Sequence, residues 1–266
     1  MKISNYIRLS AALILLVTSV AAMGAAPVEN GGKGPLDKTV FVHYPKHEPA
    51  KPAKPGPGGT GVLSSSYKYS GVRWGNPSVD YYVNTSGTTV GRAAEAIQAS
   101  FEIWGAASSD LKFNYQGATA KEAGGTADET NVVSWADITQ DYPHAIAVTF
   151  IWSYRYNKQI VEVDTIMNSG SGFVWSYTSP KETQDLSGPA VSDATRYADP
   201  DKSGDSGTYD IRNIMTHEAG HWIMLGDLYN STDSLLTMYG YGSLGEIAKD
   251  TLGYGDELGV ERAYGP

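Results

Sequence analysis

Two histidines and a glutamate in the C-terminal part of the chain have the spacing of a metal-binding catalytic motif, His217-Glu218-Ala219-Gly220-His221. On an α-helix, His217 and His221 project from one face because they are four residues apart, so their imidazoles converge on one Zn²⁺ ion. The carboxylate of Glu218 then reaches the water on the open side of the metal. Zinc lowers the pKa of such a water to about 7, and a carboxylate can take its proton during attack on a carbonyl carbon. The motif therefore predicts metal-assisted hydrolysis with Glu218 as general base.

The sequence on both sides of the motif favours a helix. Ile211, Ile214 and Trp222 recur with helical spacing. Asp210 stands where a carboxylate in the first turn interacts favourably with the helix dipole. We therefore expect a helix near residues 209–224 that carries both histidines.

Upstream of the motif, the hydrophobic pattern predicts a mixed α/β domain. Five stretches rich in β-branched and aromatic residues are expected to be strands, and one stretch has apolar residues at helical spacing. The expected strands are residues 79–84, 111–115, 131–135, 145–152 and 160–167, and the expected first helix is 90–107. The order is strand, helix, four strands, a long loop and the motif helix.

The motif is followed by Asp227, ten residues after its first histidine, and by the segment Leu236-Thr237-Met238-Tyr239-Gly240-Tyr241. With these features the chain resembles the metzincin zinc endopeptidases, and among them a matrixin-like prokaryotic branch. The resemblance extends to segments 210–216 and 251–265 and covers residues 70–266. It implies an α/β zincin catalytic domain with a twisted, mostly parallel five-stranded sheet, an antiparallel edge strand, an active-site helix and a Met-turn.

The resemblance also implies a role for each site residue. Three residues would be zinc ligands: His217, His221 and Asp227. Glu218 would be the general base, and Met238 would be the methionine of the turn, forming an apolar floor under the metal. Aspartate is a sound ligand because a carboxylate oxygen binds zinc at about 2.0–2.2 Å.

The identity of the third ligand depends on how the motif helix ends. The family usually has glycine seven residues after the first histidine, where the helix breaks sharply, and this chain has Met224 there. A bulky residue makes a left-handed turn costly by about 1 kcal/mol. Glu246 is the alternative ligand, in a thermolysin-like site where Asp227 would only orient a histidine. We favour Asp227.

The N-terminal part of the chain divides into two segments ahead of the domain. Residues 1–26 have the charged start, apolar run and small-residue end of a secretory signal peptide. Residues 27–62 are rich in Pro, Gly and Lys, which predicts a linker or a short pro-segment in which His43 and His47 are solvated. Residues 63–266 would be the catalytic domain. We therefore expect a secreted, extracellular protein with no stable membrane insertion after signal cleavage.

Composition excludes several classes of function. The formal net charge of −9 at pH 7 disfavours nucleic acid as a partner. The absence of cysteine excludes disulfides, thiolate metal ligands and a cysteine nucleophile. Matrixins commonly keep a pro-segment cysteine on the zinc, so any inhibition by residues 27–62 must be steric or use another ligand. We expect the protein to be a monomer.

A second metal site is a hypothesis for the acidic segment 199–205. Its oxygen-bearing side chains fall at positions 1, 3 and 5 of a calcium-binding loop, with glycine at position 6. The candidate Ca²⁺ ligands are Asp199, Asp201, Ser203 and Asp205. Asp210 stands at position 12, where glutamate is usual. A solvated acidic loop is an equally good interpretation of this segment.

Taken together, these patterns predict a secreted zinc metalloendopeptidase, a hydrolase that cuts protein or peptide substrates through a zinc-activated water and Glu218. Substrate would lie extended along the edge strand 145–152, where main-chain pairing supplies affinity. A secreted zinc-binding protein without turnover is disfavoured, because Glu218 is not needed merely to hold zinc. A surface binding or structural module is disfavoured by the ligand set and the turn together.

Overall fold

The computed structural model describes residues 34–46, 64–178 and 204–266. The predicted signal peptide lies outside the described residues. So do His47 and three of the four candidate calcium ligands, Asp199, Asp201 and Ser203.

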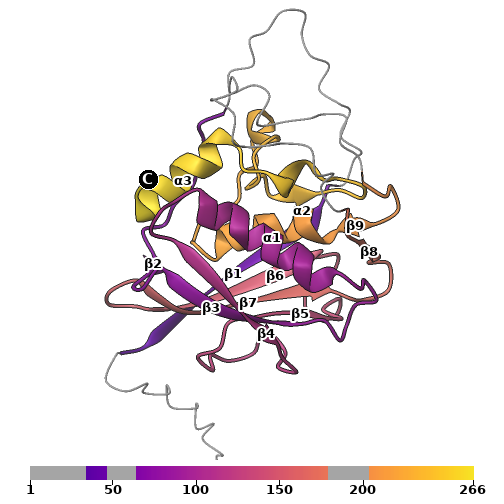
Figure 1. Cartoon of the computed structure of the whole chain (residues 1–266), viewed down its shortest axis with the longest axis horizontal. Helices are drawn as coiled ribbons and strands as arrows, with labels where there is room; N and C mark the ends of the chain where they lie inside the picture. Colours follow the sequence, from indigo (N-terminus) through magenta and orange to yellow (C-terminus); the bar gives the residue numbers. More distant parts are fainter. Residues whose placement is uncertain (1–33, 47–63, 179–203) are drawn as a thin grey trace, which may run out of the picture.

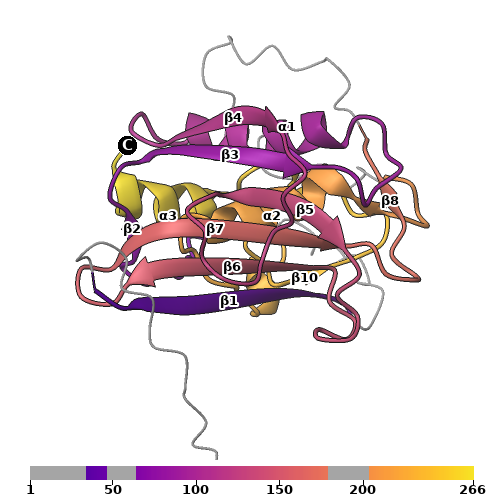
Figure 2. The same ribbon diagram turned by 90° about the horizontal axis from the view of Figure 1, so that it is seen from below.

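Within the residues that the structure describes, an eight-stranded sheet is the main layer of an α/β fold (Figure 2). Its strands are β1 (Leu36–Pro45), β2 (Arg73–Trp74), β3 (Ser78–Asn84), β4 (Lys112–Ala118), β5 (Val132–Ala136), β6 (Ala147–Tyr154), β7 (Gln159–Asn168) and β10 (Tyr241–Gly242). They follow the order β10-β1-β6-β7-β5-β3-β4, and β2 pairs with β7. A separate pair joins β8 (Trp175–Ser176) to β9 (Tyr209–Asp210).

The five predicted strands are all present, as β3 to β7, and the sheet is mostly parallel as expected. β6 runs antiparallel to both of its neighbours, β1 and β7. The prediction of five strands is too small, because β1, β2 and β10 add to the sheet. Two of these additions are only two residues long, which is too short to show a periodic pattern in the sequence.

β1 corrects two predictions. The linker interpretation of residues 27–62 is wrong for its part 36–45, which forms a strand paired with β6 from Leu36 opposite Tyr154 to His43 opposite Ala147. The stretch 145–152 is therefore not the edge of the sheet. β-branched and aromatic residues give 36–45 its strand propensity. The composition of the whole segment 27–62 does not show this propensity, because Pro, Gly and Lys dominate the residues on both sides.

Three α-helices of the described chain lie on one face of the sheet (Figure 1): α1 (Ala93–Ala106), α2 (Ile211–His221) and α3 (Tyr254–Tyr264). Two 3₁₀ turns, η2 (Ser231–Asp233) and η3 (Ala248–Asp250), connect the later segments. The main apolar core fills the space between the helices and the sheet. In the described part of the chain, no helix combines the length and apolar character that a membrane crossing needs.

Hydrogen bonds from α1 set the position of α2. The indole Nε1–H of Trp104 donates to the backbone oxygen of Thr216 at 2.7 Å. The hydroxyl of Ser100 lies 3.2 Å from the backbone oxygen of Arg212. Because both acceptors lie on α2 within the buried interface, α1 fixes how far α2 is rotated about its axis.

Asp210 is the N-cap of α2, so it lies just before the first turn in which it was expected. Its carboxylate accepts hydrogen bonds from the backbone N–H groups of Asn213 at 2.9 Å and Thr178 at 2.7 Å. The side chain is buried and satisfies an N–H group that the helix itself leaves free. Asp210 therefore anchors the start of the helix that carries both histidines.

Gly220 marks the closest approach of α2 to its neighbours. A Cβ at this position would lie 2.8 Å from Cζ2 of Trp104 and would also collide with Sδ of Met238. The Trp104 ring is held by its hydrogen bond to α2, so it cannot move away freely. We expect Gly220→Ala to lower the free energy of unfolding by about 1–2 kcal/mol, because overpacking outweighs the better helix propensity of alanine. Urea unfolding measures this loss.

Gly91→Ala is the matched control, because no neighbouring atom lies within 4 Å of the added Cβ. It should change the free energy of unfolding by less than about 0.5 kcal/mol. Equal stability of both variants would contradict the close packing at Gly220.

Candidate metal centre

The two motif histidines lie on one face of α2 with both side chains fully buried. Nδ1 of His217 lies 2.7 Å from the backbone oxygen of Thr237, and Nδ1 of His221 lies 2.7 Å from that of Leu225. A carbonyl oxygen only accepts, so each Nδ1 carries the hydrogen and donates it. Each Nε2 is thereby left as the nitrogen that can face a metal, which is the usual arrangement for histidine ligands.

Asp227 completes a cluster with these two nitrogens. Its Oδ1 lies 3.1 Å from Nε2 of His217 and 3.5 Å from Nε2 of His221. All three atoms are buried, and none has a hydrogen-bond partner among the described residues. Ligand atoms about 2.0–2.2 Å from a tetrahedral metal lie roughly 3.3–3.6 Å from one another. The cluster can therefore hold a metal ion of the size of zinc, and the residues present fit that group.

The charge states of His217 and Asp227 favour a cation between them. Burial lowers the pKa of His217 to about 4, so this imidazole is neutral at pH 7. Burial opposes ionisation of Asp227, but the two histidines outweigh it and hold the pKa of its carboxyl well below the usual range. For His221, burial again opposes the charged form, and Asp227 outweighs it so that the pKa is raised. A lone pair of His217 therefore faces a carboxylate oxygen, and a cation between them satisfies both.

The end of α2 brings Asp227 to the histidines. The N–H of Met224 donates to the backbone oxygen of His221 at 2.8 Å, and the N–H of Leu225 donates to that of Gly220 at 3.1 Å. These two bonds and a φ of +60° at Met224 form a Schellman motif, which usually has glycine at this position. The left-handed residue costs about 1–2 kcal/mol. The Met224 side chain is buried in the main core, and this packing offsets the strain.

Met238 lies in a buried turn against α2. The carboxylate of Asp256 accepts hydrogen bonds from the backbone N–H groups of Thr237, Met238 and Gly253 at 2.7, 3.1 and 2.8 Å. The backbone oxygen of Thr237 in this turn is the group that fixes His217. The turn therefore orients His217, and the side chain of Met238 packs against α2 at Gly220.

Glu218 is fully buried and points toward the sheet. Its Oε2 accepts a hydrogen bond from the hydroxyl of Thr149 at 2.6 Å. Thr149 lies 2.7 Å from the hydroxyl of Thr165, which accepts from the indole N–H of Trp222 at 2.9 Å. Thr149 uses its single hydroxyl hydrogen on Glu218, so the hydroxyl of Thr165 must donate to Thr149. The hydrogen bonds therefore run from Trp222 through Thr165 and Thr149 to Glu218. Burial raises the pKa of Glu218 to about 7.

His43 also belongs to this site, and the prediction that it is solvated is wrong. Its Nδ1 lies 3.0 Å from Oε1 of Glu218, and its ring centroid lies 4.0 Å from that of His217. Its Nε2 lies 3.4 Å from Nζ of Lys249, which is also buried. The Pro, Gly and Lys content of residues 27–62 predicts a solvated His43. The alternation of side chains along a strand, however, places Phe41 and His43 on one face.

The other predicted site residues lie elsewhere. Glu246, the alternative third ligand, accepts a hydrogen bond from the backbone N–H of Ser243 at 2.9 Å and is not part of the cluster. Asp205, the one described candidate calcium ligand, is exposed, and its carboxylate lies 3.3 Å from the backbone nitrogen of Gly207. Calcium binding stays a prediction.

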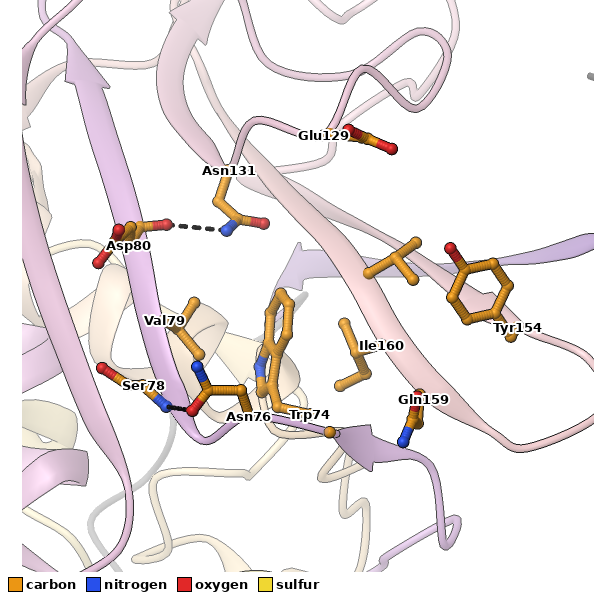
Figure 3. A pocket seen from close by; sticks show the side chains of 12 residues that line it. Trp74, Asn76, Ser78, Val79, Asp80, Glu129, Asn131, Tyr154, Gln159 and Ile160 are labelled. Carbon is orange, nitrogen blue, oxygen red and sulfur yellow. Dashed lines mark hydrogen bonds between the residues drawn. The ribbon is translucent and has the colours of Figure 1, made fainter. Parts of the chain in front are cut away.

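A separate hollow of about 430 Å³ opens beside β2, β3 and β7 (Figure 3). Asn131 stands on its wall and donates from Nδ2 to the backbone oxygen of Asp80 at 2.8 Å. None of the residues that line this hollow belongs to the metal cluster.

No protein-family model matches the chain, and no curated protein matches it. What the cluster can do therefore follows from its geometry and its chemistry.

The cluster predicts which single substitution empties the metal site. We expect Asp227→Ala to lose most of the bound zinc, because it leaves two ligands where about three are needed to hold the ion. Metal analysis after gel filtration measures the zinc content.

Glu246→Ala is the control, because it removes a carboxylate of the same region that lies outside the cluster and accepts a hydrogen bond from the backbone N–H of Ser243. It should keep one zinc per chain. A metal-free Glu246→Ala variant beside a zinc-loaded Asp227→Ala variant would contradict the ligand set.

Proposed function

We propose that this protein is a zinc-dependent endopeptidase of the metzincin type, similar to matrixins and secreted from the cell. The observation that carries the proposal is the convergence of three buried, unpartnered ligand atoms beside a buried glutamate. The topology supports it, since a mostly parallel sheet carries one antiparallel strand, β6, on the side of the metal cluster.

Zinc is the metal that the donor set fits best. Catalytic zinc sites use three protein ligands and keep one position open, and two imidazoles with one carboxylate are a common set. The hydrogen bonds from each Nδ1–H to a backbone carbonyl are the supporting contacts that such ligands usually have. His217, His221 and Asp227 would hold the ion.

When bound, zinc supplies Lewis acidity that polarises a peptide carbonyl and makes water more acidic. Glu218 would accept the proton of the attacking water and deliver it to the leaving amine. A carboxylate beside the metal can both take and release a proton during such a reaction. Thr149 would hold the carboxylate in position through Oε2, so that Oε1 serves the reaction.

A peptide substrate would bind as an added strand against β6. The side of β6 away from β7 lies next to the metal cluster but is paired with β1 in this structure, so a peptide would bind there only when β1 has left. Such pairing recognises main chain rather than side chains, which suits an endopeptidase of broad specificity.

One observation favours the alternative of a zinc-binding protein without turnover. Oε1 of Glu218 is hydrogen-bonded to His43, so the proposed base is not free in this structure. The two functions differ in whether replacement of Glu218 changes any reaction.

Replacing Glu218 by glutamine tests the proposed chemistry. Glu218→Gln keeps the size of the side chain but cannot take a proton, so we expect the zinc-loaded variant to cleave a general protein substrate at least ~100-fold more slowly than wild type. Zinc content and melting temperature should be those of the wild type.

Glu246→Gln is the matched control outside the cluster and should cleave at the wild-type rate. Unchanged cleavage by Glu218→Gln would contradict the role of the base. A zinc-loaded protein that cleaves no peptide bond even after β1 has been displaced from β6 would favour the alternative function.

A further inference from the structure

β1 occupies the side of β6 along which a peptide substrate is proposed to bind. It pairs antiparallel with β6 over eight residue pairs and parallel with β10 at Tyr44 and Pro45. The N–H of Ile146 donates to the backbone oxygen of His43 at 2.7 Å, and the N–H of Lys46 donates to that of Gly242 at 2.9 Å. Figure 2 shows β1 along the outer side of β6. The main-chain groups of β6 that a substrate would use are therefore already paired.

Two side chains of β1 reach the metal cluster. The ring of Phe41 stacks on His221 with centroids 4.0 Å apart and an interplanar angle of 3°. The ring of His43 lies 4.0 Å from that of His217. Both histidines of the cluster are thus covered from the groove side by the chain's own N-terminal strand.

His43 sits in a closely fitted pocket. Its Nδ1 faces the carboxylate of Glu218 at 3.0 Å, and its Nε2 faces the ammonium of Lys249 at 3.4 Å. A neutral imidazole with its hydrogen on Nδ1 satisfies both neighbours, because Nε2 then accepts from Lys249. A Cβ at Gly242 would lie 3.2 Å from Nε2 of His43 and 2.9 Å from Cδ1 of Ile146, so the pocket has no spare room.

We propose that residues 36–45 are an intramolecular blocking strand, which occupies the peptide groove and holds Glu218 through His43 until it is released. The consequence of this contact is latency, which means that the enzyme is inactive until β1 leaves β6, and it rests on the proposed function. A substrate cannot pair with β6 while β1 does, and the hydrogen bond from His43 makes Oε1 of Glu218 a weaker base toward water. The blocking strand contacts Glu218 through the imidazole of His43. It therefore does not depend on a thiol, and the chain contains no cysteine.

Release of β1 is an equilibrium that mutations can shift. A peptide from solution binds only the fraction of molecules whose groove is open, so its apparent affinity falls in proportion to that fraction. Variants that weaken β1 should therefore bind an added peptide more tightly while zinc content stays the same.

The test uses the full chain loaded with zinc. The double variant Phe41→Ser/His43→Ala removes both contacts to the cluster, and Val42→Pro disrupts the strand by a second route while keeping both side chains. Val40→Thr is the matched control, because Val40 lies on the same strand and is 38% exposed. Hydrogen exchange of the amides in 36–45 reports whether β1 is docked. We expect protection in wild type and Val40→Thr, and loss of protection in both release variants.

A fluorescent synthetic peptide with the sequence of residues 36–45 measures access to the groove without catalysis. We expect both release variants to bind it at least ~10-fold more tightly than wild type, and to cleave a general protein substrate at least ~10-fold faster. Addition of Glu218→Gln to a release variant should remove the gain in cleavage but keep the gain in binding.

Two results would overturn the blocking strand: rapid exchange of the 36–45 amides in wild type, or equal peptide binding by wild type and both release variants. Gained peptide binding without any cleavage would support the blocking strand and contradict the endopeptidase. The two proposals therefore fail through different measurements.

Discussion

The reversal of the chain at the end of α2 is the feature on which the site depends. A continuing helix would rotate Asp227 away from the two histidines, and the left-handed residue Met224 prevents this. The same reversal places the backbone oxygen of Leu225 against Nδ1 of His221. One local conformation therefore supplies the third member of the cluster and orients the second. Its strain of about 1–2 kcal/mol is small beside the packing of a buried methionine side chain.

The surrounding layers hold this arrangement from three sides. α1 fixes the rotation of α2 through Trp104, and the turn stabilised by Asp256 orients His217. The sheet contributes from below, where Thr149 on β6 holds the carboxylate of Glu218. These contacts orient His217, α2 and the carboxylate of Glu218 through the protein's own groups, as a preformed site requires.

The sequence predicted the parts of this structure that repeat with a clear period. The five strands β3 to β7 and the motif helix follow from patterns of many residues, and the site residues on α2 follow from their spacing. The sequence does not reveal β1, because its ten residues lie in a region dominated by Pro, Gly and Lys. His43 was missed with it, since its burial arises only when β1 pairs with β6, a contact distant in sequence. For Met224 the sequence predicts the strain of a left-handed backbone conformation. It does not predict the burial of the side chain in the main core, which offsets this strain.

The central claim is that His217, His221 and Asp227 hold one metal ion. A crystal structure of the zinc-loaded protein, with anomalous scattering recorded at the zinc edge, tests this most directly. We expect one anomalous peak per chain at this cluster, about 2.0–2.2 Å from both Nε2 atoms and from an oxygen of Asp227. A peak at any other group of side chains, or a zinc ion that touches neither histidine, would contradict it.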